Sequence, residues 1–415
     1  MSLSNITLSA AVRQNLLSLQ GTADLLATTQ TRLATGKKVN SALDNPTNFF
    51  TAAGLDARAS DISNLLDSIG NGVQVLQAAN TGITSLSSLV DTAKSIANQV
   101  LQQPTGYTSR ANVSIAAPSG VGAQAVAGTT TDLTNGGTNS LQGKTLIFKT
   151  SATATTTLTL SNVAGAGNVN SITSLNSALS AAGVQLQASL NTNGSITFTS
   201  TNEAASQTIT ATGTFAAPPA GSSSSVDVSG TATFGAVTAA AADPVSQSTR
   251  ANLVAQYNQV IQQITTTAQD SSFNGINLLN GDSLKLVFDE TGKSSVTISG
   301  VTFNPTGLGL STLTAGTDFI DNTATNSVLT ALNTASVTLR AQASAFGANL
   351  SIVQIRQDFN KNIINVLQTG SSNLTLADAN EEAANSQALS TRQSIATSAL
   401  ALANQSQQNV LQLLR

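Results

Sequence analysis

The side chains that most often carry out enzyme chemistry are scarce in this sequence. Its 415 residues include no Cys and no His, so thiolate nucleophiles, imidazole bases and metal sites built from either residue are excluded. The 20 Asp and Glu residues leave a carboxylate-only active site as an option, but they are scattered. No Walker loop or dinucleotide-binding fingerprint occurs. We therefore predict a protein that is not an enzyme, with no catalytic, cofactor-binding or metal-binding residues.

Basic side chains are equally sparse. The 17 Lys and Arg residues form no cluster longer than the pair Lys37-Lys38, and the formal net charge is −3. Nucleic-acid binding requires a dense basic surface, so no nucleic-acid partner is expected. The lysine pair directly follows Gly36, a helix-stop residue, and cations are favourable at the carbonyl end of a helix.

Neither a membrane span nor a cleaved secretory signal is expected. The sequence has no unbroken apolar stretch of about 18 residues, the minimum that crosses a bilayer. In the first residues no basic region precedes an apolar block, and Arg13 lies within an amphipathic pattern. A chain without Cys and rich in Ser, Thr and Asn is nevertheless typical of exported surface proteins. We therefore expect export by a route that cleaves no signal peptide.

Apolar residues recur at heptad spacing near both ends of the chain. The N-terminal series is Val12, Leu16, Leu19, Ala23, Leu26 and Leu33. The C-terminal series is Leu389, Ala396, Ala399, Ala403, Val410, Leu413 and Leu414. A helix with such a stripe must bury it, so we expect the two ends to pack on each other or on neighbouring subunits. These residues are therefore predicted to be packing positions of an assembly protein.

Two long helices are predicted before the middle of the chain. The first covers residues 4–35 and ends at Gly36; the second follows the Asn45-Pro46 break and continues to about residue 102. Glycines within the second helix weaken it by about 1 kcal/mol each, so packing must stabilise it. These glycines are Gly70, Gly72 and Gly82.

The region after Pro104-Thr105-Gly106 changes in character. Charged residues become rare, Thr and Ser dominate, and short alternating runs such as Ser195–Thr199 follow the hairpin signal Asn193-Gly194. A helix is predicted within residues 172–190. Disorder is the alternative for such a composition, and residues 214–245 are predicted to be its most mobile part. We favour a folded, β-rich insert.

Helical patterning then returns. The predicted elements are a helix over residues 246–268, paired strands at 284–288 and 294–298, a helix from about 326 that is interrupted at Gly370-Ser371-Ser372, and a final helix from about 376.

The predicted fold class is mainly α with a β-rich insert. Residues 1–45 with 371–415 are expected to form an antiparallel coiled coil of terminal helices. Residues 46–103 with 247–370 are expected to form a helical layer with one β-hairpin. Residues 104–246 are expected to be a variable, surface-exposed insert with an α/β or β fold.

Three long motifs in this order resemble those of bacterial flagellin. Residues 32–46 (RLATGKKVNSALDNP) are similar to the segment that joins the family's first two helices. Residues 270–281 (DSSFNGINLLNG) resemble a family loop, and residues 403–415 (ANQSQQNVLQLLR) resemble its C-terminal signature. The resemblance covers about residues 1–103 and 247–415, so the insert is not matched.

The resemblance implies an extracellular subunit of the bacterial flagellar filament, which forms a helical homopolymer and gives swimming motility. In the family the terminal helices are disordered in the monomer and fold on assembly. Export through the flagellar type III apparatus is implied, as are an export chaperone, the cap and the hook-junction proteins as partners. No cofactor is implied.

One family motif is altered here. The family stretch that the vertebrate flagellin-sensing Toll-like receptor reads has the form L-Q-R-x-R-E-L-A. The corresponding residues 90–97 are VDTAKSIA, in which Asp91, Thr92 and Ile96 depart from that pattern. Thr92 replaces a key arginine, so we predict weak or no receptor activation.

Two alternative functions stay open at this point. One is a hook–filament junction protein of the same family. The other is a surface adhesin in which a coiled-coil stalk carries the uncharged insert as a binding module. Deletion of residues 105–245 would discriminate a filament subunit from an adhesin. A filament subunit should still polymerise, whereas an adhesin should lose its function.

Overall fold

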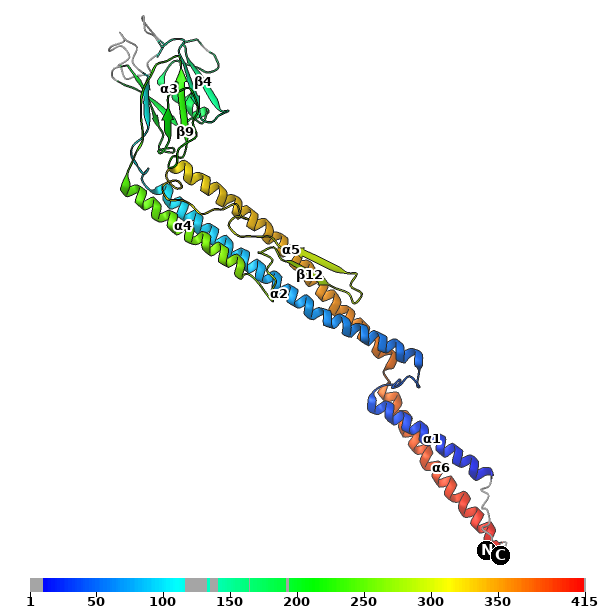
Figure 1. The fold of residues 1–415 in the computed structure, drawn as a ribbon. Helices are drawn as coiled ribbons and strands as arrows, with labels where there is room; N and C mark the ends of the chain where they lie inside the picture. The colour runs from blue at the N-terminus through cyan, green and yellow to red at the C-terminus, as the bar shows by residue number, and fades with distance from the viewer. Residues whose placement is uncertain (1–9, 116–132, 135–140, 164, 192–193, 414–415) are drawn as a thin grey trace. The chain divides into compact units, whose positions relative to one another are not determined.

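The computed structural model describes residues 10–115, 133–134, 141–163, 165–191 and 194–413 (Figure 1). The helices are α1 (Ala10–Thr35), α2 (Pro46–Gln102), α3 (Ile172–Ala181), α4 (Pro244–Asp270), α5 (Asn322–Thr375) and α6 (Ala379–Leu413). The strands are β1 (Tyr107–Ser109), β2 (Asn112–Ile115), β3 (Thr145–Lys149), β4 (Thr155–Leu160), β5 (Asn168–Val169), β6 (Leu186–Leu190), β7 (Ile196–Ser200), β8 (Thr208–Thr210), β9 (Ser225–Gly230), β10 (Phe234–Thr238), β11 (Ala241–Ala242), β12 (Ser283–Val287) and β13 (Ser295–Ser299). This content confirms the predicted mainly α fold with a β-rich insert.

The chain forms two compact units. The first contains the chain up to Val73, Lys285–Thr297 and the chain from Ser351 onward. The second contains Gln74–Leu284 and Ile298–Leu350, and it includes the whole insert. The long helices α2 and α5 contribute to both units.

The predicted break between the first two helices is confirmed. α1 ends before Gly36, whose φ of +66° is a conformation that glycine adopts without strain. α2 begins at Pro46, and the Asn45 side-chain oxygen accepts a hydrogen bond from Asn48 N–H at 3.0 Å. The predicted start of the first helix at residue 4 lies outside the described residues.

The predicted interruption of the penultimate helix is wrong. α5 continues through Gly370 and ends at Thr375, and α6 begins at Ala379. Just before this glycine, Leu367 packs in a buried cluster with Ala59 and Ile62 of α2. This packing offsets the cost of about 1 kcal/mol that one glycine imposes on a helix.

The predicted β-hairpin is present in the first unit. β12 and β13 pair, and Phe288 N–H donates to Ser294 O at 2.8 Å. Asn360 of α5 donates to Phe288 O at 3.0 Å, and Arg58 of α2 forms an ion pair with Glu290 at 2.6 Å. The hairpin is therefore held by both long helices.

The described residues of the insert form two larger sheets and one helix. Its four-stranded sheet is antiparallel throughout, with strand order β10-β2-β7-β6. Its five-stranded sheet has the order β5-β4-β3-β9-β8 and is mixed, because the β4–β5 and β8–β9 pairs are parallel. A short β1–β11 ribbon joins the two chain segments that enter and leave the insert.

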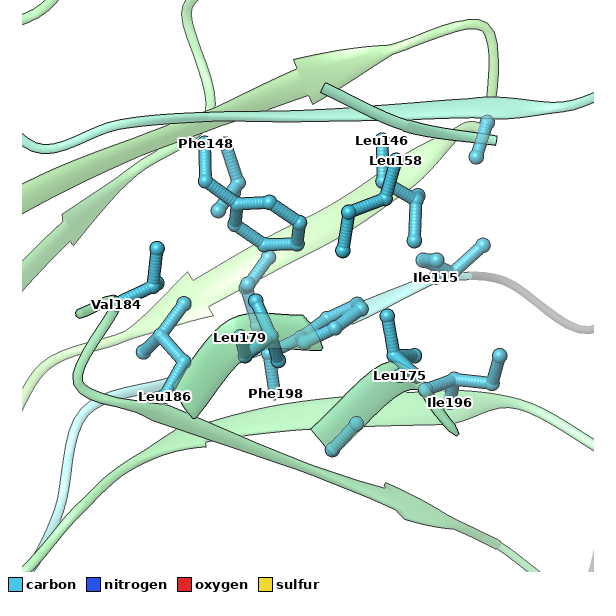
Figure 2. Packing of buried hydrophobic residues seen from close by; sticks show 14 of the residues in the cluster. Ile115, Leu146, Phe148, Leu158, Leu175, Leu179, Val184, Leu186, Ile196 and Phe198 are labelled. Carbon is cyan, nitrogen blue, oxygen red and sulfur yellow. The ribbon is translucent and has the colours of Figure 1, made fainter. Parts of the chain in front are cut away.

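The core of the insert lies between these sheets and α3. Figure 2 shows Phe148 of the five-stranded sheet facing Phe198 of the four-stranded sheet, with Leu175 and Leu179 of α3 beside them. The two phenyl rings form an edge-to-face contact with centroids 5.4 Å apart. This continuous apolar core explains why so uncharged a segment folds.

The predicted helix within residues 172–190 is present as α3. It ends at Ala181, before Val184, because Gly183 turns the chain with a φ of +68° and Leu186 and Ala188 then alternate into the core as part of strand β6. A second detail of the insert prediction is wrong. Residues 214–245 were predicted to be the most mobile part, yet they contribute β9, β10 and β11. β9 is paired on both sides, with β3 and β8. The Asn193-Gly194 signal lies partly outside the described residues, and the strands on either side of it pair as expected.

Candidate assembly surface

α1 and α6 form an antiparallel pair within the first unit. At one end of the pair, Arg32 of α1 and Glu382 of α6 form an ion pair with an N–O distance of 3.3 Å. Next to it, Lys38 N–H donates to Thr375 O at 2.7 Å and Ala377 N–H donates to Gly36 O at 2.9 Å. The two connecting segments are thus joined through their backbones, which fixes where the helix pair begins.

The contact between the two helices follows a heptad repeat. On α6 the less exposed positions are Glu382, Ser386, Leu389, Gln393, Ala396, Leu400 and Ala403. On α1 they include Val12, Asn15, Leu19, Thr22, Ala23, Leu26, Thr29 and Arg32. Many of these side chains are polar or small, so the pair buries little apolar surface of its own.

Large apolar side chains instead point away from the pair. Leu17 and Leu25 of α1 are 69% and 57% exposed, and Ile395 and Leu402 of α6 are 64% and 69% exposed. Ile395 and Leu402 are seven residues apart, which places them on one side of α6. The helix pair therefore presents unpartnered apolar surface on both of its helices.

These outward residues are not among the predicted packing positions because they lie between the positions of the predicted heptads. On α6 the signal that could have found them is a second heptad, formed by Ile395 and Leu402 and offset by one position from Ala396 and Ala403. Leu17 and Leu25 of α1 are eight residues apart and carry no such signal.

The predicted packing positions divide between these two surfaces. Val12, Leu19, Ala23, Leu26, Leu389, Ala396 and Ala403 lie toward the α1–α6 contact. Leu16, Leu33 and Ala399 are exposed. Val410 and Leu413 lie on α6, but their side chains are outside the described part of the structure, as is the whole of Leu414.

Both ends of the chain match models of one protein family. Residues 5–119 match the model of the bacterial flagellin N-terminal helical region. Residues 329–414 match the model of the bacterial flagellin C-terminal helical region. The chain belongs to the bacterial flagellin family. Flagellins are structural proteins that form the extracellular flagellar filament.

Curated relatives support the same family. The chain is 30% identical to flagellin FljM of Caulobacter vibrioides over 164 residues, which is 39% of this chain and 59% of the relative. It is 29% identical to flagellin FljO of the same species over 180 residues, 43% of this chain and 65% of the relative. A flagellin of Brucella melitensis is 25% identical over 181 residues, 41% of this chain and 64% of the relative. The chain thus matches somewhat less than two thirds of the length of these flagellins.

The stretch predicted to correspond to the family's receptor motif, residues 90–97, lies on α2 in the second unit. Asp91 and Thr92 are exposed, whereas Ile96 is buried. The Thr92 hydroxyl donates to Ser88 O at 2.9 Å, and Asp91 Oδ1 lies 3.7 Å from Lys94 Nζ. Thr92, the residue predicted to stand in place of the motif's arginine, thus presents a short hydroxyl that bonds to its own helix.

Within the described residues, no group of three or more Asp or Glu side chains is placed to hold a metal ion. None of the helices in this part of the chain is long and apolar enough to cross a membrane.

Proposed function

We propose that this chain is a subunit of the bacterial flagellar filament and that it polymerises helically outside the cell to support swimming. The observation that carries this proposal is the unpartnered apolar surface on α1 and α6, represented by Leu17, Leu25, Ile395 and Leu402. Burying each such side chain is worth about 1.5–3 kcal/mol, so neighbouring subunits that cover them would stabilise an assembly.

We expect these contacts to produce an open polymer. The apolar residues exposed on α1 differ from those exposed on α6, and each set is proposed to meet a different surface on a neighbouring copy. Such head-to-tail contacts produce a filament when the rotation between copies does not close a ring. Family membership supports the same outcome.

In this proposal the terminal helices gain their order on assembly. A helix pair with a seam of small and polar residues is weakly stable alone and becomes stable when its apolar faces are covered. Residues 1–45 and 371–415 would form the inner layer, residues 46–103 and 247–370 the next layer, and residues 104–246 the solvent-facing insert.

Family membership also suggests how the chain reaches the filament and what it meets there. We propose export through the flagellar type III apparatus without a cleaved signal peptide. An export chaperone, the filament cap and the hook-junction proteins are the partners that this route requires. No enzymatic activity is part of the proposal.

The first test changes the outward apolar residues. Replacement of Leu25 and Leu402 by Gln should leave the α1–α6 contact intact and prevent seeded polymerisation, as seen by electron microscopy. The matched control is Val163→Gln, which changes a 64% exposed apolar residue of the insert. Filaments of normal length from the Leu25 and Leu402 variant would contradict the proposal.

A second test concerns the end of the chain. Replacement of Leu413 and Leu414 by Ala should also block polymerisation, because each buried Leu lost costs roughly 2–5 kcal/mol. Circular dichroism of the secreted monomer should show that the layer over residues 46–370 stays folded. Heat-resistant filaments of normal length would argue against a packing role for these two leucines.

A further inference from the structure

Asp321 lies at the junction between the insert and the helices of the second unit. Its side chain is fully buried, with 0% exposure. One carboxylate oxygen, Oδ1, accepts from Ala324 N–H at 3.0 Å, and the Asp321 carbonyl accepts from Thr325 N–H at 3.1 Å. These are the contacts of a helix N-cap, so Asp321 starts α5.

The other carboxylate oxygen is bound entirely by the insert. Oδ2 accepts from Ser206 N–H at 3.2 Å, from Ser206 Oγ at 2.6 Å and from Ser223 Oγ at 2.5 Å. Ser206 Oγ in turn accepts from Ser223 N–H at 2.6 Å. Hydrogen bonds to a charged, buried group are about twice as strong as neutral ones, so this is a strong local contact.

The turn that carries Ser206 also contacts the first turn of α5 through its backbone. The Glu203 carbonyl accepts from Thr323 N–H at 2.8 Å and from Thr323 Oγ1 at 2.9 Å. Ala204 and Ala205, between Glu203 and Ser206, are fully buried. The insert is therefore packed against the start of α5 rather than joined to the helices only through its connecting segments.

Arg250 of α4 reinforces the same junction. It is 1% exposed, and its guanidinium donates to Pro104 O at 2.9 Å and to Phe319 O at 2.8 Å. Pro104 lies where the chain leaves α2 for the insert, and Phe319 lies just before α5. Arg250 of α4 thus joins the segment that follows α2 to the segment that precedes α5, next to the insert.

We propose that Asp321 is an interdomain lock that couples the insert to the helical layer, so that the two open and unfold together. The carboxylate binds the helix and the insert at the same time. Its Oδ1 caps α5, and its Oδ2 accepts hydrogen bonds from Ser206 and Ser223 of the insert. Separation of the insert would leave Oδ2 without its protein donors and would expose the buried turn at residues 203–206.

Asp321→Asn is the sharpest test of the lock. Asn is as good an N-cap as Asp, so its side-chain oxygen keeps the bond to Ala324. The amide NH₂ then replaces Oδ2 and faces the donor Ser206 N–H, and the hydroxyls of Ser206 and Ser223 can no longer donate to it. The variant therefore weakens the contact with the insert while it keeps the cap of α5. We expect hydrogen exchange of residues 203–210 and 220–226 to become roughly 10- to 100-fold faster, measured by mass spectrometry on the full-length monomer.

Two further variants keep the result interpretable. Ser206→Ala combined with Ser223→Ala removes the partners and leaves Asp321 in place, so it should accelerate the same insert peptides without affecting the first turn of α5. The matched control is Asp243→Asn, which alters the N-cap of α4, where the carboxylate accepts from Val245 N–H and Ser246 Oγ. It should not change exchange in residues 203–226.

The proposal is overturned if residues 203–226 exchange at the wild-type rate in both Asp321→Asn and the double serine variant. It is also overturned if Asp243→Asn accelerates these residues as strongly as Asp321→Asn does, because the effect would then reflect general loosening of the junction.

Discussion

Gly82 of α2 faces Ser271, at the end of α4, so closely that a Cβ on Gly82 would lie 2.2 Å from Ser271 Oγ and 2.6 Å from Leu279 Cδ1. Ser271 Oγ donates to Thr267 O at 2.6 Å, and Leu279 is fully buried, so neither side chain is free to move aside. The glycine therefore permits a close helix–loop contact and is more than a weak point of α2.

Alanine at Gly82 and at Gly70 should have opposite effects on stability. Gly82→Ala should lower the free energy of unfolding by about 1–3 kcal/mol through overpacking. Gly70, on the same helix, has nothing within 4 Å of its added Cβ, so Gly70→Ala should raise the free energy of unfolding by up to about 1 kcal/mol. Urea denaturation of the monomer measures both. Equal changes in the free energy of unfolding in the two variants would contradict the close contact of Gly82 with Ser271 and Leu279.

Arg250→Met should destabilise the second unit strongly. The variant keeps an aliphatic side chain but leaves the buried carbonyl of Phe319 and the carbonyl of Pro104 without this donor. We expect a loss of about 2–5 kcal/mol in thermal or urea unfolding. Arg392→Met, which changes an exposed arginine of α6, is the control and should alter monomer stability by less than about 0.5 kcal/mol.

Both tyrosines should lose their phenolic protons at an unusually high pH. Burial raises the pKa of Tyr257 to about 12 and, together with the negative charge of Asp321, raises the pKa of Tyr107 to about 12. Since the folded-state pKa is raised, the associated stability is complete below the unfolded value of about 10 and is lost as the pH rises through the folded value. The chain has two tyrosines and no Trp, so tyrosinate absorbance reports them directly. A titration midpoint near 10 in the folded protein would be inconsistent with this burial.

The segment between α1 and α2 should lose order in acid. Hydrogen bonds from the backbone N–H groups of Ser41 and Asn40, at 2.8 and 2.9 Å, hold the pKa of Asp44 below its ordinary value. A lowered pKa stabilises the fold above the unfolded value of about 3.9, and this contribution disappears as the pH falls through the folded value. Amide chemical shifts of Asn40 and Ser41 should follow that titration. In Asp44→Asn the same shifts should be independent of pH.

Activation of the vertebrate flagellin-sensing receptor should be weak. Thr92, which we predict to occupy the arginine position of the family motif, presents a short hydroxyl bonded to Ser88 O. Loss of a central arginine typically costs more than about 2 kcal/mol in a protein interface. A receptor reporter assay should therefore show little response to this chain, and Thr92→Arg should increase the response. A normal dose–response from the unchanged chain would refute the prediction.

Local sequence determined the boundaries of most helices. Gly36 and the Asn45-Pro46 pair act through their own backbone preferences, so the break between α1 and α2 could be read directly. The heptads at both ends predicted the antiparallel terminal helices, and the three motifs indicated the family that the comparisons then showed.

Tertiary structure decided what depends on contacts between distant residues. Gly370 is compatible with a helix end or a helix interior, and the packing of Leu367 on α2 selected the interior. Residues 214–245 have the composition of a mobile segment, yet pairing of β9 with β3 and β8 orders them. The bonds from Asp321 to Ser206 and Ser223 join residues about a hundred positions apart. Spacing along the chain carries no information about such contacts, because they form only when separate elements pack together.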